Sequence, residues 1–287
     1  MSASYRGRIA PSPTGLLHIG HARTFWQAYR RAQDAHGTLI LRNEDLDPQR
    51  SRPDFAAAML EDLRWLGIRW QEGPDVGGPV APYEQSRRRP VYLAVWKQLA
   101  AGGYLYPCTC SRKDLSSIAQ APHEGGPAPR WEQDEGPMYP GICRPKAGQA
   151  AVDAEAPAGV NWRFRVPAGD AIEFVDQHLG PQRFVAGEDF GDFPVWRRDD
   201  VPAYQLAVVA DDIAMGITEV VRGADLLLST ARQLLIYRAL QQAPPRWFHC
   251  SLVVDEQGER LAKRHDALSI RALREQGKTT AEVLGDP

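Results

Sequence analysis

The chain has 287 residues, of which 43% are hydrophobic and 24% are charged, and this is the composition of an ordinary globular protein. A net charge of -2 does not single out a nucleic-acid-binding protein, although a local basic patch would still be compatible with it. The N-terminus has no secretory signal, and no apolar run approaches the roughly 18 residues that span a bilayer. We therefore expect a cytoplasmic protein that makes no contact with membranes.

Strand-like and helix-like segments alternate over the first hundred or so residues. Residues 6–10 are predicted to form a short strand, which ends at the turn-rich segment Pro11-Ser-Pro-Thr-Gly15 because no helix can cross it. Strands and helices in alternation at this spacing favour a parallel α/β sheet. The elements expected after the turn are a helix over 18–35, a strand over 38–42, and helices over 55–66 and 90–101.

The pattern changes after Tyr104, where a stretch rich in proline and glycine leads into β-rich sequence. Strand-like segments at 160–166 and 172–176 predict antiparallel pairing. The sequence therefore predicts an α/β domain that is interrupted by a β-rich insertion. The later elements expected are a hairpin over 193–209 whose second strand begins at Tyr204, a helix over 229–241, a strand over 251–254, and one or two helices within 267–284.

The predicted helix over 18–35 begins with His18-Ile-Gly20-His21, directly after the turn. A helix N-terminus carries free N–H groups and a partial positive charge, so it suits a phosphate group. Gly20 would let a flat adenine ring approach the backbone, and the histidines could donate hydrogen bonds to charge that builds up on a phosphorus atom under attack. Taken alone, this short string is also compatible with an ordinary surface turn.

The surrounding sequence favours the catalytic interpretation. Arg8-Ile-Ala-Pro-Ser-Pro-Thr-Gly-Leu-Leu-His18-Ile-Gly-His21 resembles the first signature of class I aminoacyl-tRNA synthetases, in the form found in their glutamyl branch. Arg260-Leu-Ala-Lys263-Arg264 stands where that class carries its mobile lysine loop, with Ala262 in place of a serine and Arg260 in place of a lysine. The resemblance implies a Rossmann-like catalytic fold that binds ATP with Mg²⁺. It assigns catalysis to His18, His21 and Lys263, and ATP binding to these residues together with Gly20.

The resemblance extends to a glutamate pocket. Arg42-Asn-Glu44-Asp-Leu-Asp is similar to the acidic stretch of the family, and Arg222 lies in the matching Val-Val-Arg-Gly segment. Arginines can form charge-assisted bonds to the two carboxylates of glutamate, and Glu44 can face its ammonium group. An acidic residue among arginines could otherwise be a surface salt bridge of little energetic value. The implied pocket consists of Arg8, Ile9, Ala10, Pro11, Ser12, Glu44, Tyr204 and Arg222.

Three of the four cysteines lie close together in the sequence, at Cys108, Cys110 and Cys143. Three thiolates suit a tetrahedral structural zinc ion, and so few cysteines do not form a disulfide framework in a chain of this size. Resemblance to the small synthetases, which carry a Tyr-x-x-x-Cys arrangement, implies Tyr139 as the fourth ligand. His123 is the chemically more usual ligand and remains the alternative, because a phenol must lose a proton from a pKa of about 10 in order to bind.

The chain stops soon after Lys263, where a glutamyl-tRNA synthetase continues into an anticodon-binding region. With the cysteine pattern, this resembles the glutamyl-Q tRNA(Asp) synthetases, which transfer activated glutamate to queuosine in the anticodon of tRNA(Asp). We expect a monomer with one structural zinc ion and no anticodon-binding domain. The implied parts are the first half of the catalytic domain (1–103), an insertion with the zinc site (104–192), and the second half with the lysine loop and a short helical tail (193–287).

Three other functions remain compatible with the sequence. A truncated or partner-dependent glutamyl-tRNA synthetase would charge tRNA(Glu) instead. Another adenylate-forming nucleotidyltransferase would activate a different acid. A non-catalytic paralogue would act as an RNA-binding or regulatory module. The presence of His18, His21 and Lys263 together disfavours this third function.

Overall fold

A computed structural model describes residues 4–111, 138–146, 155–157, 159–253 and 269–285. The N-terminal part has the expected parallel pair of strands, with β1 (Arg6–Ile9) beside β2 (Thr38–Leu41) and helix α1 (Ile19–Asp34) connecting them. The predicted strands and helices of this half are confirmed. Its other helices are α2 (Pro53–Trp65), the 3₁₀ helix η1 (Gln85–Arg87) and α3 (Arg89–Ala101).

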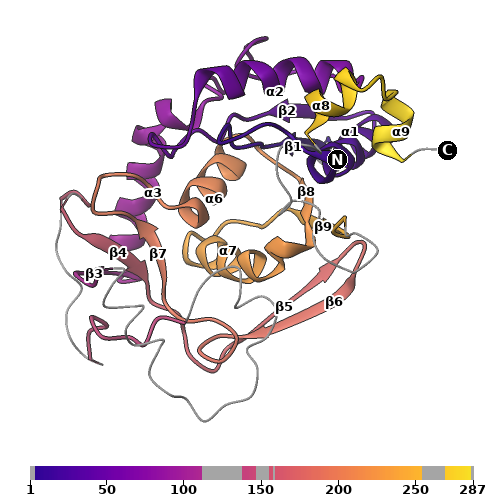
Figure 1. The fold of residues 1–287 in the computed structure, drawn as a ribbon. Coiled ribbons are helices and arrows are strands. Elements are labelled where there is room, and N and C mark those ends of the chain that lie inside the picture. The colour runs from indigo at the N-terminus through magenta and orange to yellow at the C-terminus, as the bar shows by residue number, and fades with distance from the viewer. Residues whose placement is uncertain (1–3, 112–137, 147–154, 158, 254–268, 286–287) are drawn as a thin grey trace, which may run out of the picture.

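A second parallel pair, β8 (Glu219–Gly223) with β9 (Arg246–Cys250), lies next to the first. The backbone N–H of Thr218, just before β8, donates to the carbonyl oxygen of Arg6 in β1 at 2.9 Å, which joins the two pairs. On its other side β9 pairs in parallel with β5 (Ala171–Asp176), and β5 forms an antiparallel hairpin with β6 (Gly180–Val185). In Figure 1 this hairpin extends away from β8 and β9.

A separate antiparallel sheet follows α3. It has the strand order β3 (Leu105–Cys108), β4 (Asn161–Phe164) and β7 (Phe193–Trp196). The antiparallel pairing expected for the β-rich part is therefore present, although β4 and β5 belong to different sheets.

The predicted second strand of the 193–209 hairpin is wrong, because Tyr204–Ala214 is the helix α6. Residues 205 to 212 are all buried, so the apolar run Leu-Ala-Val-Val shows neither the alternation of a half-exposed strand nor the stripe of a surface helix. Figure 1 shows α6 and α7 (Leu227–Ala239) in the interior of the molecule, between the two groups of strands. The 3₁₀ helix η2 (Ala224–Leu226) leads into α7, which matches the helix expected over 229–241.

The strand expected over 251–254 is also misplaced. The strand is β9, which ends at Cys250, where its pairing with β8 ends at Gly223. Residues 251 to 253 leave the sheet at its carboxyl end without regular structure, and residue 254 lies outside the described residues. Carboxyl ends of parallel strands are where such folds bind ligands, and residues 251 to 253 lie at this edge of the sheet.

The tail forms two short helices, α8 (Ile270–Glu275) and α9 (Thr280–Leu284), as predicted for 267–284. Helix α9 lies beside α1, and α8 contacts α2 through the pair of Arg271 with Glu61, both near the N-terminus (Figure 1). Their buried residues Ile270 and Val283 join the apolar core that α1, β1, β2 and α2 share. A second core lies around α3, β4, β7, α6 and α7. In the described part of the chain, no helix has the length and apolar character that crossing a membrane requires.

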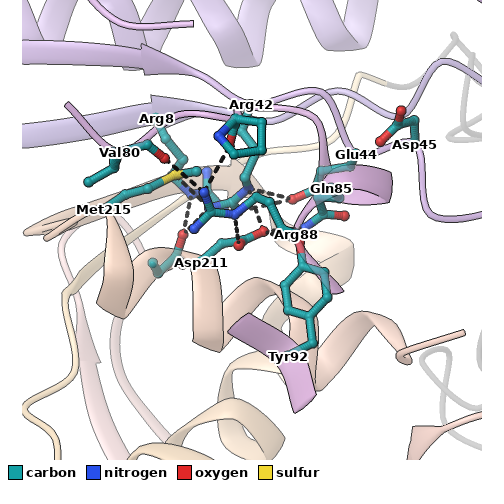
Figure 2. A network of polar contacts seen from close by, with 12 residues as sticks. Arg8, Arg42, Glu44, Asp45, Val80, Gln85, Arg88, Tyr92, Asp211 and Met215 are labelled. Atoms are coloured by element: carbon teal, nitrogen blue, oxygen red, sulfur yellow. Dashed lines mark hydrogen bonds and ion pairs between the residues drawn. The ribbon is translucent and has the colours of Figure 1, made fainter. Parts of the chain in front are cut away.

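Charged side chains in the interior connect β2, α3 and α6 (Figure 2). Arg42, which directly follows β2, is fully buried and donates to Asp212 at 2.7 Å and to Glu44 at 3.0 Å. Asp211 accepts bonds from Arg88 at 2.6 Å, Gln85 at 2.7 Å and Tyr92 at 2.9 Å. Because α6 is a helix, it brings both of these aspartates to the arginines. We call Arg42, Glu44, Arg88, Asp211 and Asp212 the buried charge network.

We expect the Asp211→Ala substitution to lower the free energy of unfolding by about 3–5 kcal/mol, because it leaves the buried Arg88 without its counter-charge. The midpoint of urea-induced unfolding measures this effect. Lys278→Ala is the control, since Lys278 forms an exposed pair with Glu282 at 2.9 Å, and such pairs contribute less than about 1 kcal/mol. Equal midpoints for the two variants would contradict this role of Asp211.

Candidate active site

A cavity of about 370 Å³ opens beside the carboxyl ends of β1 and β8 and the N-terminus of α1. It is large enough for a small-molecule ligand, and polar and charged groups converge on it from both parallel pairs. The structure brings most of the sequence-predicted site residues together here. Those that line the cavity are Arg8, Ala10, Pro11, Ser12, His18, Gly20, His21, Glu44, Tyr204 and Arg222.

His18 and His21 are fixed by the start of α1. The Nδ1 atom of His18 accepts the N–H of Gly20 at 3.1 Å, and the Nδ1 atom of His21 accepts the N–H of His18 at 3.3 Å. The two rings stack with their centroids 3.7 Å apart. A side chain at Gly20 would meet the His18 ring, because a Cβ atom there would lie 3.0 Å from its Cε1 atom. Glycine at this position therefore makes room for the imidazole that caps the helix.

These hydrogen bonds define the charge and tautomer of both histidines. Burial lowers the pKa of His18, and burial together with the nearby His18 lowers the pKa of His21 to about 3, so both rings are neutral near pH 7. Since each Nδ1 atom acts as an acceptor, the proton of each neutral ring must be on Nε2. The helix start thus offers two neutral N–H donors from its histidine side chains.

The residues of the expected glutamate pocket come from several elements. Arg8 is buried in β1, and its Nη1 atom donates to the carbonyl of Val221 at 3.0 Å. Burial raises the pKa of Glu44, whereas Arg42 and Arg8 act in the opposite direction. Ile9 differs from the other predicted residues, because its side chain is fully buried in the core and does not line the cavity.

Arg222 lies on β8 and is held from several sides. Its Nε atom donates to His249 at 3.2 Å, and its terminal nitrogens donate to Gln233 at 3.0 Å and to Thr230 at 2.6 Å. Its guanidinium group also lies 4.8 Å from the ring centroid of Trp247. The side chain is buried, yet it lines the cavity, so it can present a fixed positive charge to a ligand.

A second cavity of about 370 Å³ adjoins the first. Four residues line both cavities, namely Ser12, Thr14, Glu44 and Tyr204. The second cavity also contains the charged residues Asp47, Arg50 and Arg197. A molecule bound there would lie next to a ligand in the first cavity.

Lys263, Arg260 and Ala262 lie outside the described residues, as does His123. The described residues on either side of the 254–268 segment lie close to the first cavity. Val253 lines it, and Ser269 pairs with His18, while the N–H of Ile270 donates to the carbonyl of Leu17 at 2.7 Å.

The three predicted cysteine ligands form a cluster next to the β3–β4–β7 sheet. The Sγ atoms of Cys108, Cys110 and Cys143 all lie within 4.8 Å of one another. The hydroxyl of Tyr139 lies 3.5 Å from the Sγ of Cys108 and 3.8 Å from that of Cys110. Sequence reasoning therefore identified a group of four residues that the fold does bring together.

Several residues of the cavity were not identified from the sequence. Ser251–Val253, which line the cavity, were assigned to a strand. Asp225 was overlooked because a lone acidic residue after a strand is usually solvated. The 3₁₀ helix η2, which contains Asp225, brings its carboxylate near His18. The further lining residues are Thr14, Thr24, Phe25, Val221, Gly223 and Leu226.

Comparison with known proteins identifies the family. The family described as tRNA synthetases class I (E and Q), catalytic domain, matches residues 4–284. The chain belongs to this family. It is therefore a ligase of the glutamyl-tRNA synthetase-like type, with the class I catalytic fold that the signatures implied.

Relatives in the family have two kinds of name. Proteins named glutamyl-Q tRNA(Asp) synthetase from Nitratidesulfovibrio vulgaris and Symbiobacterium thermophilum are 49% and 48% identical, over 98% and 97% of this chain and 84% of each relative. A glutamate–tRNA ligase 2 from Nitrosococcus oceani is 43% identical over 94% of this chain and 56% of its own length. These matches confirm the resemblance to the glutamyl-Q tRNA(Asp) synthetases.

Solved structures give the same result for the fold. The crystal structure of a glutamate tRNA ligase from Elizabethkingia meningosepticum in complex with its amino acid has a TM-score of 0.76 and 30% sequence identity. The match covers 96% of this chain and 54% of that one.

Proposed function

We propose that the enzyme activates L-glutamate with ATP and transfers the glutamyl group to the queuosine base in the anticodon of tRNA(Asp). The observation that carries this proposal is the first cavity, where a histidine-capped helix start faces two buried arginines and a buried glutamate.

In the first step an oxygen of the glutamate α-carboxylate attacks the α-phosphorus of ATP, and the bond to pyrophosphate breaks. Negative charge then spreads over the phosphate oxygens, where N–H donors stabilise it. The Nε2–H groups of His18 and His21 supply such donors. Lys263 would add a positive charge on the pyrophosphate side, and Mg²⁺ that arrives with ATP would neutralise part of the triphosphate charge.

Glutamate has two carboxylates and an ammonium group, and the cavity has matching charges. Arg8 and Arg222 are the partners for the carboxylates, while Glu44 is the partner for the ammonium group. Ser12 and Tyr204 add neutral hydrogen bonds, and Ala10 and Pro11 complete the wall. Arg42 supports the position of Glu44, because it donates to the Oε1 atom of Glu44 at 3.0 Å.

In the second step a hydroxyl oxygen of the acceptor attacks the glutamyl carbonyl carbon, the bond to AMP breaks, and the hydroxyl proton is released. The second cavity supports this step, because its shared wall of Ser12, Thr14, Glu44 and Tyr204 would place an acceptor beside the activated group. No protein nucleophile is needed.

The choice of acceptor is supported by the relatives. Those at 49% and 48% identity have glutamyl-Q tRNA(Asp) synthetase as their name, and this chain spans 84% of their length. The alternative is transfer to tRNA(Glu), which the 43% identical glutamate–tRNA ligase favours.

For the first step we predict that Lys263→Ala lowers glutamate-dependent exchange of pyrophosphate into ATP by about 100-fold or more, since it removes a charge that stabilises the transition state. Lys278→Ala, which removes an exposed lysine, should leave the exchange rate unchanged. Full exchange activity in Lys263→Ala would remove Lys263 from the mechanism.

For the acceptor we predict that radiolabelled glutamate is transferred to tRNA(Asp) that carries queuosine. The same tRNA with an unmodified guanosine at that position is the matched control and should accept none. Charging of tRNA(Glu) in place of queuosine-containing tRNA(Asp) would contradict the proposed acceptor and favour the alternative.

We also propose that Cys108, Cys110, Cys143 and Tyr139 hold a structural zinc ion within the 104–192 insertion. The donor set fits zinc, because three thiolates with a fourth ligand at comparable separations suit a tetrahedral site. Burial alone would raise the pKa of Cys143, but the backbone N–H of Thr109, with Tyr139 and Cys110, holds it at about 6. The ion would link β3 to the segment around Tyr139.

We expect about one zinc ion per chain by metal analysis of the purified protein, in line with a closed structural site. Cys143→Ser should lose most of this zinc, whereas Cys250→Ser, outside the cluster, should keep it. Tyr139→Phe should weaken zinc retention against a chelator and His123→Ala should not. The reverse pattern would make His123 the fourth ligand, and retained zinc in Cys143→Ser would exclude the site.

A further inference from the structure

The guanidinium group of Arg222 has a hydrogen-bond partner that the proposed reaction does not use. Its Nε–H group points to the Nε2 atom of His249, 3.2 Å away, and His249 is fully buried on β9. An arginine can only donate hydrogen bonds, so the Nε2 atom of His249 must be an acceptor. This bond therefore requires a neutral histidine with its proton on Nδ1.

Asp176 determines that tautomer. Its Oδ2 atom lies 2.6 Å from the Nδ1 atom of His249. An ionised carboxylate can only accept hydrogen bonds, so the proton must lie on Nδ1 of the ring. Burial and the nearby Arg222 lower the pKa of His249 to about 4, and the ring is thus neutral under ordinary conditions. The three residues therefore form a chain of hydrogen bonds in which Arg222 donates to His249 and His249 donates to Asp176.

Asp176 is itself held in place by the β5–β6 hairpin. Its Oδ1 atom accepts the backbone N–H groups of His178 at 3.0 Å and Leu179 at 2.8 Å. Its Oδ2 atom also accepts the backbone N–H of His249 at 3.1 Å, where β5 meets β9. Burial would raise the pKa of Asp176, but the bonds from His249 and from these backbone groups outweigh it and lower the pKa. The carboxylate thus stays ionised.

The orientation of the planar Arg222 guanidinium determines which of its N–H groups face the cavity. Its terminal nitrogens donate to Gln233 and Thr230, and the guanidinium group also interacts with the Tyr204 side chain at the cavity. Each terminal nitrogen carries a second N–H group, so a guanidinium held in this orientation can offer a matched pair of donors to a carboxylate. Rotation of the guanidinium group would turn one of these two N–H donors away from the carboxylate.

We propose that Asp176 and His249 are positioning residues, which hold the Arg222 guanidinium in the orientation that binds a carboxylate of the amino-acid substrate. This proposal rests on the proposed role of Arg222 in glutamate binding. It assigns to the β5–β6 hairpin a part in substrate affinity, although the described residues of that hairpin do not line the cavity.

The decisive variant is Asp176→Asn, which keeps the size and shape of the side chain but can reverse the direction of its hydrogen bond with His249. An asparagine amide donates to Nδ1, the ring proton then moves to Nε2, and this proton faces the Nε–H group of Arg222. We expect KM for glutamate in pyrophosphate exchange to rise about tenfold or more, the equivalent of one lost charged hydrogen bond, with KM for ATP within about twofold of wild type.

Glu173→Gln is the matched control, because it makes the same chemical change at an exposed position of the same strand, β5. It should leave both KM values unchanged. A role of Asp176 in stability alone would move the unfolding midpoint without this selective change in KM for glutamate.

A pair of substitutions at His249 tests the proposal independently. His249→Gln puts an amide oxygen near the former Nε2 position and can still accept from Arg222, whereas His249→Asn keeps a donor for Asp176 but leaves Arg222 without its acceptor. We expect His249→Gln to retain more glutamate affinity than His249→Asn. Equal values for the two, or an unchanged KM for glutamate in a folded Asp176→Asn variant, would overturn the proposal.

Failure of this proposal can be separated from failure of the proposed function. Absence of glutamate-dependent exchange in the wild-type enzyme would reject the function itself. If wild type is active and Arg222→Lys raises KM for glutamate while Asp176→Asn does not, Arg222 binds substrate without help from Asp176 and His249.

Discussion

The structure depends on a group of charges that is buried between the two halves of the fold. Arg42 at the end of β2 is fully buried, and its contacts with Glu44 and Asp212 connect the N-terminal strands to helix α6. Removal of such charges from water is unfavourable unless each one has its counter-charge and hydrogen bonds in place. The network therefore constrains the relative position of β2, α3 and α6. Glu44 belongs to it and lines the cavity, so the same constraint orients a carboxylate at the cavity wall.

The cavity combines fixed charges with neutral donors. The two arginines and the glutamate match the charged groups of an amino acid, whereas the two histidines are kept neutral by burial and by their helix-capping bonds. Neutral imidazoles stabilise charge that develops on a phosphate without binding the substrate phosphate strongly beforehand, which favours the transition state over the ground state. Preorganisation of this kind comes from the helix start itself, since the capping bonds fix both rings.

Sequence reasoning located the parts of the site that depend on local patterns or on a signature. The turn before α1, its histidines, the cysteine cluster and the parallel strands of the first half follow from short-range spacing and turn chemistry. Helix α6 was misassigned as a strand because all its central residues are buried, so periodicity gave no signal. The end of β9 was misplaced because pairing with β8, and not composition, determines where that strand stops.

The contacts that support the cavity from behind could not be predicted from the sequence, because they join residues that are far apart in it. Asp176 and His249 are 73 residues apart, and Arg42 and Asp212 are 170 apart, so only the fold brings them together. An aspartate or histidine in a strand is most often exposed, and nothing local marks these as buried partners. The family signature marks most of the residues that line the cavity, but the residues that hold them in place come from the packing of distant strands and helices.

The most direct test of the account is pyrophosphate exchange into ATP with glutamate, glutamine and aspartate as separate substrates, in the absence of RNA. The arginines and glutamate of the cavity predict that glutamate alone supports strong exchange. Glutamine lacks the second carboxylate, and aspartate is too short for its two carboxylates to reach both Arg8 and Arg222. Exchange that proceeds equally well with glutamine or aspartate, or that does not occur with glutamate, would contradict the assignment of this cavity.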